Sequence, residues 1–298
     1  EIGGDLVAHL VELTKGGAEY IAPRYRRDRA FRLGRSALRG DGGAQPGSHV
    51  DQVGEGARVH LLHHPAAVGL DGDLADAQFA ADLLVHQAGD HPVHDLALAA
   101  AENALAAGEW RPQDIATVFA SADGDGAVTH ALCQSFAMDE PEVSPTQFHN
   151  SVHNAPAGYW GIATRSSRPS TSLAADQDTF AVGLFEAALQ ATLDPGPVLL
   201  VAFDLPLPHP LALMRPRRHG LAVALLLARE PRRRRLATLA LRLEQDAAAS
   251  PPPPGLEALR DNPAARALPL LELLARGRQG EVRLGAVGAG QLAARCEP

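Results

Sequence analysis

The sequence has few cysteines, few aromatic residues and no long uninterrupted apolar run. Its two cysteines, Cys133 and Cys296, are too few for a disulfide framework and fit a reducing compartment. No apolar run reaches the roughly 18 residues of a membrane span, and the N-terminus lacks a basic region followed by an apolar stretch. We therefore expect a cytoplasmic protein without a membrane span or a secretory signal.

Positive charge is scarce as well. The chain has 27 Lys and Arg against 35 Asp and Glu, which gives a formal net charge of −8. A dedicated nucleic-acid binder would be strongly basic, so we expect no nucleic-acid partner. What the sequence does have is ordinary for a globular protein: its 298 residues are 46% hydrophobic and 21% charged, enough to bury a core in one or two domains.

Residues 1–91 form a poorly readable N-terminal segment without sustained periodicity and without the opening strand of an α/β unit. A frameshift, a wrongly chosen start and disorder are the explanations left open. Within this segment only residues 74–88 are predicted to be helical. The histidines at 60, 63 and 64 match no zinc-ligand spacing, so we expect no metal site.

From residue 92 onward the pattern alternates between helices and strands. Helices are predicted at 94–108, 128–137 and 180–193, and strands at 117–122, 170–175, 197–203 and 221–228. The last two strands are near-continuous apolar runs, as in sheets that are covered on both faces. The alternation predicts an α/β core over 92–230.

The segments after this core are predicted from composition. The arginine run at 232–235 and the stretch SPPPPG at 250–255 indicate an Arg/Pro-rich linker over 231–255. Residues 256–298 are expected to form a helix near 264–276 and a strand at 281–285 that dock on the core.

The helix at 180–193 carries a single ionisable side chain, Glu186. A helix that is apolar nearly all round is expected to be buried on all sides.

Several common catalytic and metal motifs are missing or incomplete. There is no G-x-S-x-G elbow, which removes the commonest serine-hydrolase signal. His149 and His153 have the spacing of a helical zinc site, but Asn150 stands where that motif needs a general-base Glu. Asp123 and Asp125 are interpreted as a polar turn after a strand, and Cys133 as a packed thiol in an apolar helix.

The stretch HNAPAGYWGIATRSSRPSTSLAADQDTFAVGLFEA resembles the central part of β-ketoacyl synthases of the thiolase fold. Asn154, Ala157 and Gly158 match the family's Asn-x-x-Ala-Gly segment. Arg168 and Pro169 match the pair before the strand that ends at the catalytic cysteine, and Gln177 then stands at the cysteine position.

This resemblance covers about residues 92–298 and is strongest to the short synthase-like proteins of aryl polyene and xanthomonadin-type pigment clusters. It implies a thiolase-like α/β fold, with one layered α/β/α half of the thiolase architecture and a short C-terminal tail.

The substitution at residue 177 has a chemical consequence. A cysteine at the N-terminus of a buried helix has a stabilised thiolate that accepts an acyl group, whereas the carboxamide of Gln177 cannot. The flanking Asp176 and Asp178 disfavour an anion there and are interpreted as helix-capping residues. The resemblance also gives five candidates for lining a substrate cavity: Phe148, His149, His153, Asn154 and Phe180.

The resemblance leaves three functions open. In the first, the chain is a non-catalytic, chain-length-factor-like subunit that pairs with a full-length ketosynthase with an intact cysteine in polyene or fatty-acid-type biosynthesis. In the second it is a malonyl-carrier decarboxylase or a condensing 3-oxoacyl synthase, both of which need histidines from the family's second half. In the third it is a scaffold that docks an acidic acyl carrier protein through Arg215, Arg217 and Arg218. We expect no cofactor.

Overall fold

The structure is a computed structural model, and it describes most of the chain from residue 92 onward together with one short earlier segment. The described residues are 58–62, 92–105, 110–194, 196–229, 235–245 and 248–298. The helix expected over 74–88 lies outside them. None of the helices within these ranges is long and apolar enough to cross a membrane.

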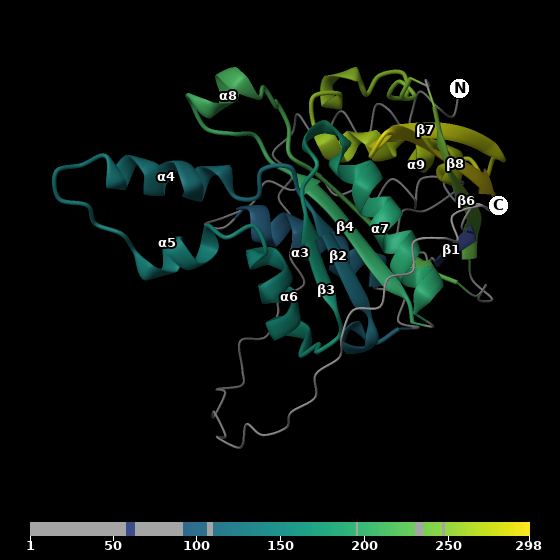
Figure 1. Cartoon of the computed structure of the whole chain (residues 1–298), viewed down its shortest axis with the longest axis horizontal. Coiled ribbons are helices and arrows are strands. Elements are labelled where there is room, and N and C mark those ends of the chain that lie inside the picture. The colour runs from purple at the N-terminus through teal and green to yellow at the C-terminus, as the bar shows by residue number, and fades with distance from the viewer. Residues whose placement is uncertain (1–57, 63–91, 106–109, 195, 230–234, 246–247) are drawn as a thin grey trace, which may run out of the picture.

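The described strands form one mixed sheet in the order β3-β2-β4-β5-β1-β6-β8-β7 (Figure 1). Their bounds are β1 Arg58–Leu62, β2 Ala116–Ala120, β3 Ser170–Leu173, β4 Val198–Asp204, β5 Leu221–Ala228, β6 Arg235–Glu244, β7 Gly280–Val287 and β8 Gly290–Glu297. β2 pairs in parallel with β3 and β4, and the other pairings are antiparallel. β1 lies within residues 1–91, where no opening strand was recognised from the sequence, because a five-residue stretch is too short to show a period.

The helices cover both faces of this sheet. Their bounds are α3 Pro92–Leu105, α4 Gly126–Phe136, α5 Pro145–Asn150, α6 Ala155–Thr164, α7 Thr179–Leu193, α8 Leu211–Met214 and α9 Leu268–Ala275. α3 packs on β4, β5 and α6, and α7 packs on the opposite face of β2, β4 and β5. The layered α/β arrangement follows from this placement.

The central strands show why their sequences are apolar without interruption. Successive side chains of a strand point to opposite faces of the sheet, and here both faces are covered by helices. In β4, Val198, Leu200 and Ala202 face α7, whereas Leu199 and Val201 face α3.

The sheet curves around α7. This helix contacts β2, β4 and β5 near one end of the strand order, and it also contacts β7 at the other end. The 3₁₀ segment η4 (Pro263–Ala267) packs against the same helix. The C-terminal strands thereby cover part of the side of α7 that the central strands leave open.

Two sequence expectations need correction here. Residues 235–244 are not part of a linker, because they form β6 and pair with both β1 and β8. α7 is not buried on all sides, because its C-terminal Leu193 is 84% exposed and Phe185 and Leu189 are half-buried.

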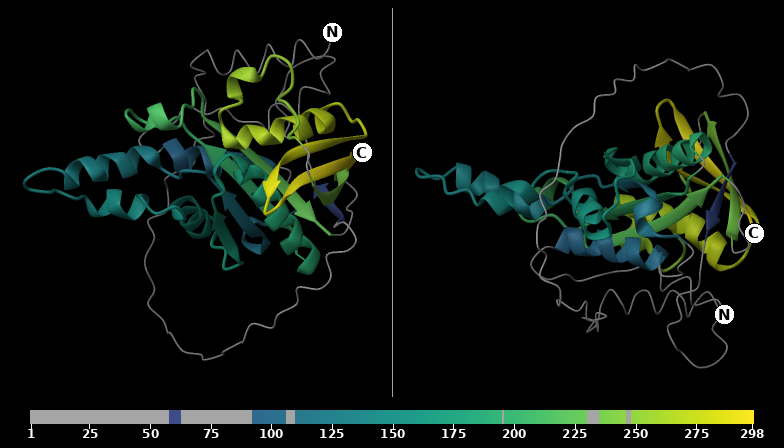
Figure 2. Two further views of the ribbon diagram at one scale, coloured as in Figure 1. Left: turned by 45° about the horizontal axis from the view of Figure 1, so that its top comes forward. Right: turned by 90° about the horizontal axis from the view of Figure 1, so that it is seen from below.

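α4 and α5 form an arm that projects from the rest of the molecule (Figures 1 and 2). Gly126 and Leu132 of α4 are buried, but nearly every residue between 133 and 149 is exposed. The arm carries large exposed apolar side chains: Phe136, Met138, Phe148 and, just after α5, Val152.

Candidate functional site

The candidate site is the turn that joins β3 to α7. The strand ends at Leu173, and the 3₁₀ turn η2 (Asp176–Asp178) leads directly into the helix. Gln177 is exposed at the apex of this turn, at the N-terminal end of α7. We call residues 174–178 the elbow. A side chain at its apex is accessible and feels the positive end of the helix dipole.

The hydrogen bonds that hold the elbow are not the capping bonds expected from the side chains of Asp176 and Asp178. Asp176 adopts a left-handed backbone conformation with φ of 48°, which is unfavourable for a non-glycine residue. Thr179 stabilises it, because its hydroxyl donates to the Asp176 carbonyl at 2.7 Å and accepts from the Ala175 N–H at 3.0 Å.

Asp178 occupies the N-cap position of α7 but makes no capping bond there, so the capping interpretation is wrong. Its Oδ1 accepts instead from the Ala286 N–H of β7 at 2.9 Å. The elbow is therefore fastened to the C-terminal hairpin. Gly285 permits this approach, because a Cβ there would lie 2.6 Å from the Asp178 carboxylate.

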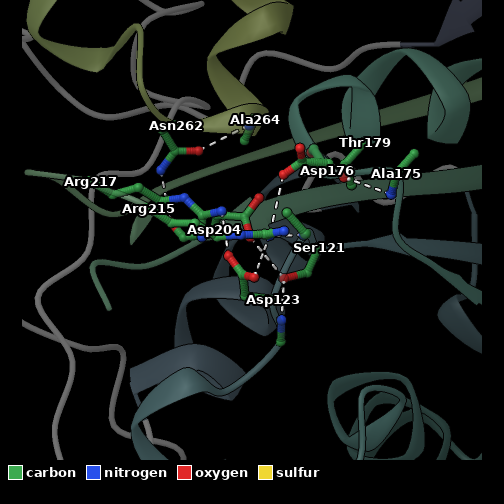
Figure 3. Close-up of polar contacts among 12 residues, drawn as sticks. Ser121, Asp123, Ala175, Asp176, Thr179, Asp204, Arg215, Arg217, Asn262 and Ala264 are labelled. Atoms are coloured by element: carbon green, nitrogen blue, oxygen red, sulfur yellow. Dashed lines mark hydrogen bonds and ion pairs between the residues drawn. The ribbon is translucent and has the colours of Figure 1, made fainter. Parts of the chain in front are cut away.

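A cluster of three aspartates and two arginines lies beside the elbow (Figure 3). We define the acidic–arginine cluster as Asp123, Asp176, Asp204, Arg215 and Arg217. Asp123 follows β2, Asp204 ends β4, and both arginines lie in the loop between β4 and β5. The cluster thus joins the carboxyl ends of two central strands to the elbow.

The two arginines of the cluster differ in burial. The side chain of Arg217 is 1% exposed and contacts the carboxylates of Asp123 and, at 3.4 Å, Asp204. The side chain of Arg215 is 41% exposed and bridges Asp123 at 2.7 Å and Asp176 at 3.3 Å. Arg217 is a core residue, whereas Arg215 closes the cluster toward solvent.

Asp204 is the most perturbed acid of this site. Burial raises the pKa of its carboxyl to about 6, against the lowering influence of the Arg217 charge and of hydrogen bonds from the Ser121 hydroxyl and the Ala122 N–H. Nearby Asp123 adds a further raising contribution. Asn262 fixes the same position by donating to the Asp204 backbone carbonyl at 2.9 Å.

The structure contradicts part of the predicted carrier-docking patch. Arg217 is buried in ion pairs, and Arg215 is paired with two carboxylates, so neither offers an unpaired surface charge. Of the three arginines, only Arg218 is exposed without a described ion pair. The sequence did not reveal this pairing, because the carboxylates that neutralise Arg215 and Arg217 come from distant parts of the chain.

The candidate cavity residues lie in different environments. Phe180 is fully buried in the core beneath the elbow, whereas Phe148 is 59% exposed on the arm. His149 is exposed and stacks edge-on against Tyr159. His153 lies near the cluster, with its Nε2 2.8 Å from the Ser121 carbonyl oxygen, and Asn154 is exposed at the start of α6. These contacts do not bring the five residues together in one lining.

Neither of the two cysteines lies in the elbow. Cys133 is exposed on α4 and is therefore not the packed thiol expected from its apolar helix. Cys296 is buried in β8, where burial, with a further contribution from Glu297, raises the pKa of its thiol to about 11. No group of three potential metal ligands occurs among the described residues.

Comparison with known proteins identifies the family of the chain. The family model for the N-terminal domain of β-ketoacyl synthases matches residues 93–282, which is more than half of the chain. The chain belongs to this family. No curated protein sequence matches it.

Two solved structures support the thiolase-like α/β fold. One is the complex of a ketosynthase (ApeO) with its chain length factor (ApeC) from Xenorhabdus doucetiae, where the matched chain is 24% identical with a TM-score of 0.53. That match covers 68% of this chain and 76% of the other. The second is the ishigamide ketosynthase/chain length factor, at 14% identity and a TM-score of 0.55, covering 82% and 98% of the two chains. The predicted fold class is confirmed.

The acidic–arginine cluster was not predicted from the sequence. Asp123 was interpreted as a turn residue, and Asp204 was not singled out at all. A usable signal existed, because Asp204 ends a strand whose other six positions are all apolar, and a buried carboxylate there has to be paired or neutral.

Proposed function

We propose that this chain is a non-catalytic, chain-length-factor-like subunit that pairs with an active ketosynthase in the assembly of a polyene or fatty-acid-type chain in the cytoplasm. The observation that carries the proposal is the carboxamide of Gln177 at the apex of the elbow. An acyl group is carried on this turn through a thioester, which glutamine cannot form. The position remains accessible, but the transfer step has to take place on another subunit.

The arm supports a protein partner. α4 and α5 are shorter than the roughly 12–15 residues at which isolated helices become even marginally stable in water, and most of their surface is exposed. Phe136 and Phe148 are 57% and 59% exposed. A subunit that covers the arm would bury these rings and stabilise both helices.

The edge of the sheet at β3 is a second argument for a protein partner. β3 pairs with β2 on one side, and no described strand pairs with its other side. An unpaired edge strand offers N–H and C=O groups to a second chain. Because β3 leads into the elbow, a subunit paired along this edge would lie close to Gln177.

Co-expression with a ketosynthase that has an intact cysteine tests the pairing. The tagged chain should co-purify with the synthase, and Phe148→Asp should reduce the recovered synthase at least tenfold, because it places a charge in the covered surface. Leu243→Asp is the matched control: Leu243 is 44% exposed on β6, away from the arm, and its substitution should leave recovery unchanged. Equal recovery with both variants would contradict the role of the arm.

Incubation of the isolated chain with acyl- and malonyl-loaded carrier protein tests the absence of catalysis. Intact-mass spectrometry should show no acyl adduct, and malonyl-carrier should stay carboxylated. An adduct on Cys133 or Cys296 would overturn the non-catalytic assignment, and loss of CO₂ would establish the decarboxylase alternative. Carrier binding without any synthase pairing would favour the scaffold.

A further inference from the structure

The loop between β4 and β5 is fixed at its two ends and exposed between them. At its start, Leu207 packs so closely on α4 that a Cβ on Gly126 would lie 2.3 Å from its Cδ2. At its end, Arg217 is buried in the acidic–arginine cluster. Between these anchors, the single turn α8 exposes Leu213 and Met214, which are 74% and 84% accessible.

Arg215 is the contact between this exposed stretch and the elbow. It follows α8 directly and reaches Asp123 at 2.7 Å and Asp176 at 3.3 Å (Figure 3). With 41% of its side chain exposed, each pair is worth no more than a surface ion pair, which breaks and re-forms readily. The bridge can therefore open without disturbing the buried Arg217.

Opening this bridge would act on the elbow through Asp176. This residue is held in the left-handed region immediately before Gln177, and such a conformation persists only where its surroundings enforce it. Arg215 holds its carboxylate and Thr179 holds its carbonyl oxygen. Removing one of these two contacts lowers the restraint on the peptide that carries the apex of the turn.

We propose that residues 208–216 form a flap that Arg215 latches onto the elbow, so that the flap and the elbow open and close together. The closed state is the one in the structure, with the guanidinium shared between Asp123 and Asp176. In the open state the flap swings on its anchors at Leu207 and Arg217 and releases the carboxylate of Asp176, the residue before Gln177. This proposal does not depend on the proposed function, because it concerns the isolated chain.

The latch responds to pH through the buried carboxyl of Asp204, which contacts Arg217. Among the described residues, two charged groups face Asp204: Asp123, from the segment after β2, and Arg217, from the loop. Ser121, Ala122 and Asn262 donate hydrogen bonds to it, and its partner on β5, Leu221, is apolar. When Asp204 is neutral, Asp123 is the only described carboxylate that neutralises the charge of Arg217. The ion pair between Asp123 and Arg215 is then weaker, because both arginines share one carboxylate. Ionisation of Asp204 draws Arg217 toward it, so the latch tightens as pH rises through about 6.

Hydrogen–deuterium exchange on the full chain tests the latch. Arg215→Met should raise exchange several-fold in peptides covering both 208–216 and 174–178, because the two segments share one contact. Arg218→Met is the matched control, since Arg218 is exposed in the same loop, and it should leave both peptides as in the wild type. Faster exchange in only one of the two segments, or equal effects of the two variants, would overturn the coupling.

The pH response is measured on the same peptides at pH 5 and pH 7.5, after division by the intrinsic exchange rates. The wild-type protein should protect both segments several-fold better at pH 7.5. Asp204→Asn should show equal protection at the two pH values, because its side chain keeps the hydrogen-bonding oxygen but cannot ionise. A wild-type protein with equal protection at both values, or an Asp204→Asn variant that keeps the difference, would refute the role of Asp204.

Discussion

At the scale of single residues, the main feature of the site is a set of buried, ion-paired side chains. Asp204 and Arg217 both have side chains that are 1% exposed, and such ions are tolerated only when each is neutralised or hydrogen-bonded. Asp204 receives bonds from the Ser121 hydroxyl and the Ala122 N–H, yet burial outweighs them and raises its pKa to about 6. The folded state therefore binds a proton more tightly than the unfolded chain does.

This raised pKa predicts a specific pH dependence of stability. The native carboxyl titrates near 6 and the unfolded one near 3.8, so the contribution of Asp204 to the free energy of unfolding is complete below 3.8 and lost as pH rises through about 6. The loss amounts to roughly 2–3 kcal/mol. Asp204→Asn should remove this decline, as measured by urea unfolding from pH 3.5 to 7.5.

Asp261→Asn serves as the charge control for this measurement, because Asp261 is exposed in the described structure. It should follow the wild-type pH profile. If the Asp204→Asn variant kept the wild-type slope between pH 4 and 6, Asp204 would already be ionised in the folded protein.

At the scale of elements, α7 lies unusually close to the sheet, and Gly183 permits this. A Cβ at residue 183 would lie 2.9 Å from the Ala120 Cβ and 3.0 Å from the Leu200 Cδ1. Alanine favours a helix over glycine by about 1 kcal/mol, but overpacking of a core costs about 1–3 kcal/mol. Gly183→Ala should therefore lower the free energy of unfolding by about 1 kcal/mol.

Gly158 in α6 provides the matched comparison. It is exposed, and a Cβ there would meet no atom within 4 Å, so Gly158→Ala should raise the free energy of unfolding by about 0.5–1 kcal/mol. Chemical denaturation of both variants tests the pair of predictions. If Gly183→Ala stabilised the protein as much as Gly158→Ala, α7 would not pack on β2 and β4 at the described distance.

The elements that could be predicted from sequence are those whose burial shows in the local pattern of apolar residues. β4 and β5 are apolar at almost every position because both faces are covered, and α7 is recognisable from its length and its single glutamate. β6 was missed because polar arginine and threonine residues interrupt its apolar ones and because an arginine run precedes it. The acidic–arginine cluster was missed because its members meet only after β2 and β4 pair, which no local window of sequence records.

At the scale of the whole molecule, the C-terminal strands cover a part of α7 that the central strands leave open. α7 packs against the central strands, and the far end of the curved sheet returns to it at β7 and η4. Asp178 adds a polar tie between the elbow and β7. The turn that carries Gln177 is thereby fastened to the C-terminal part of the sheet.

The exposed elbow leads to a prediction for the assembled complex, which rests on the proposed pairing. Gln177 is exposed in the isolated chain beside an unpaired sheet edge, so in a complex formed along β3 its carboxamide would line the space where the partner's acyl chain grows. Gln177→Ala, co-expressed with the synthase, should still co-purify with it but give less product or an altered distribution of chain lengths. Gln113→Ala, which removes an exposed carboxamide far from the elbow in sequence, should change neither pairing nor product. If the complex of the Gln177→Ala variant falls apart, Gln177 is an interface contact, and if yield and chain lengths match the wild type, the elbow contributes nothing to the partner's cavity.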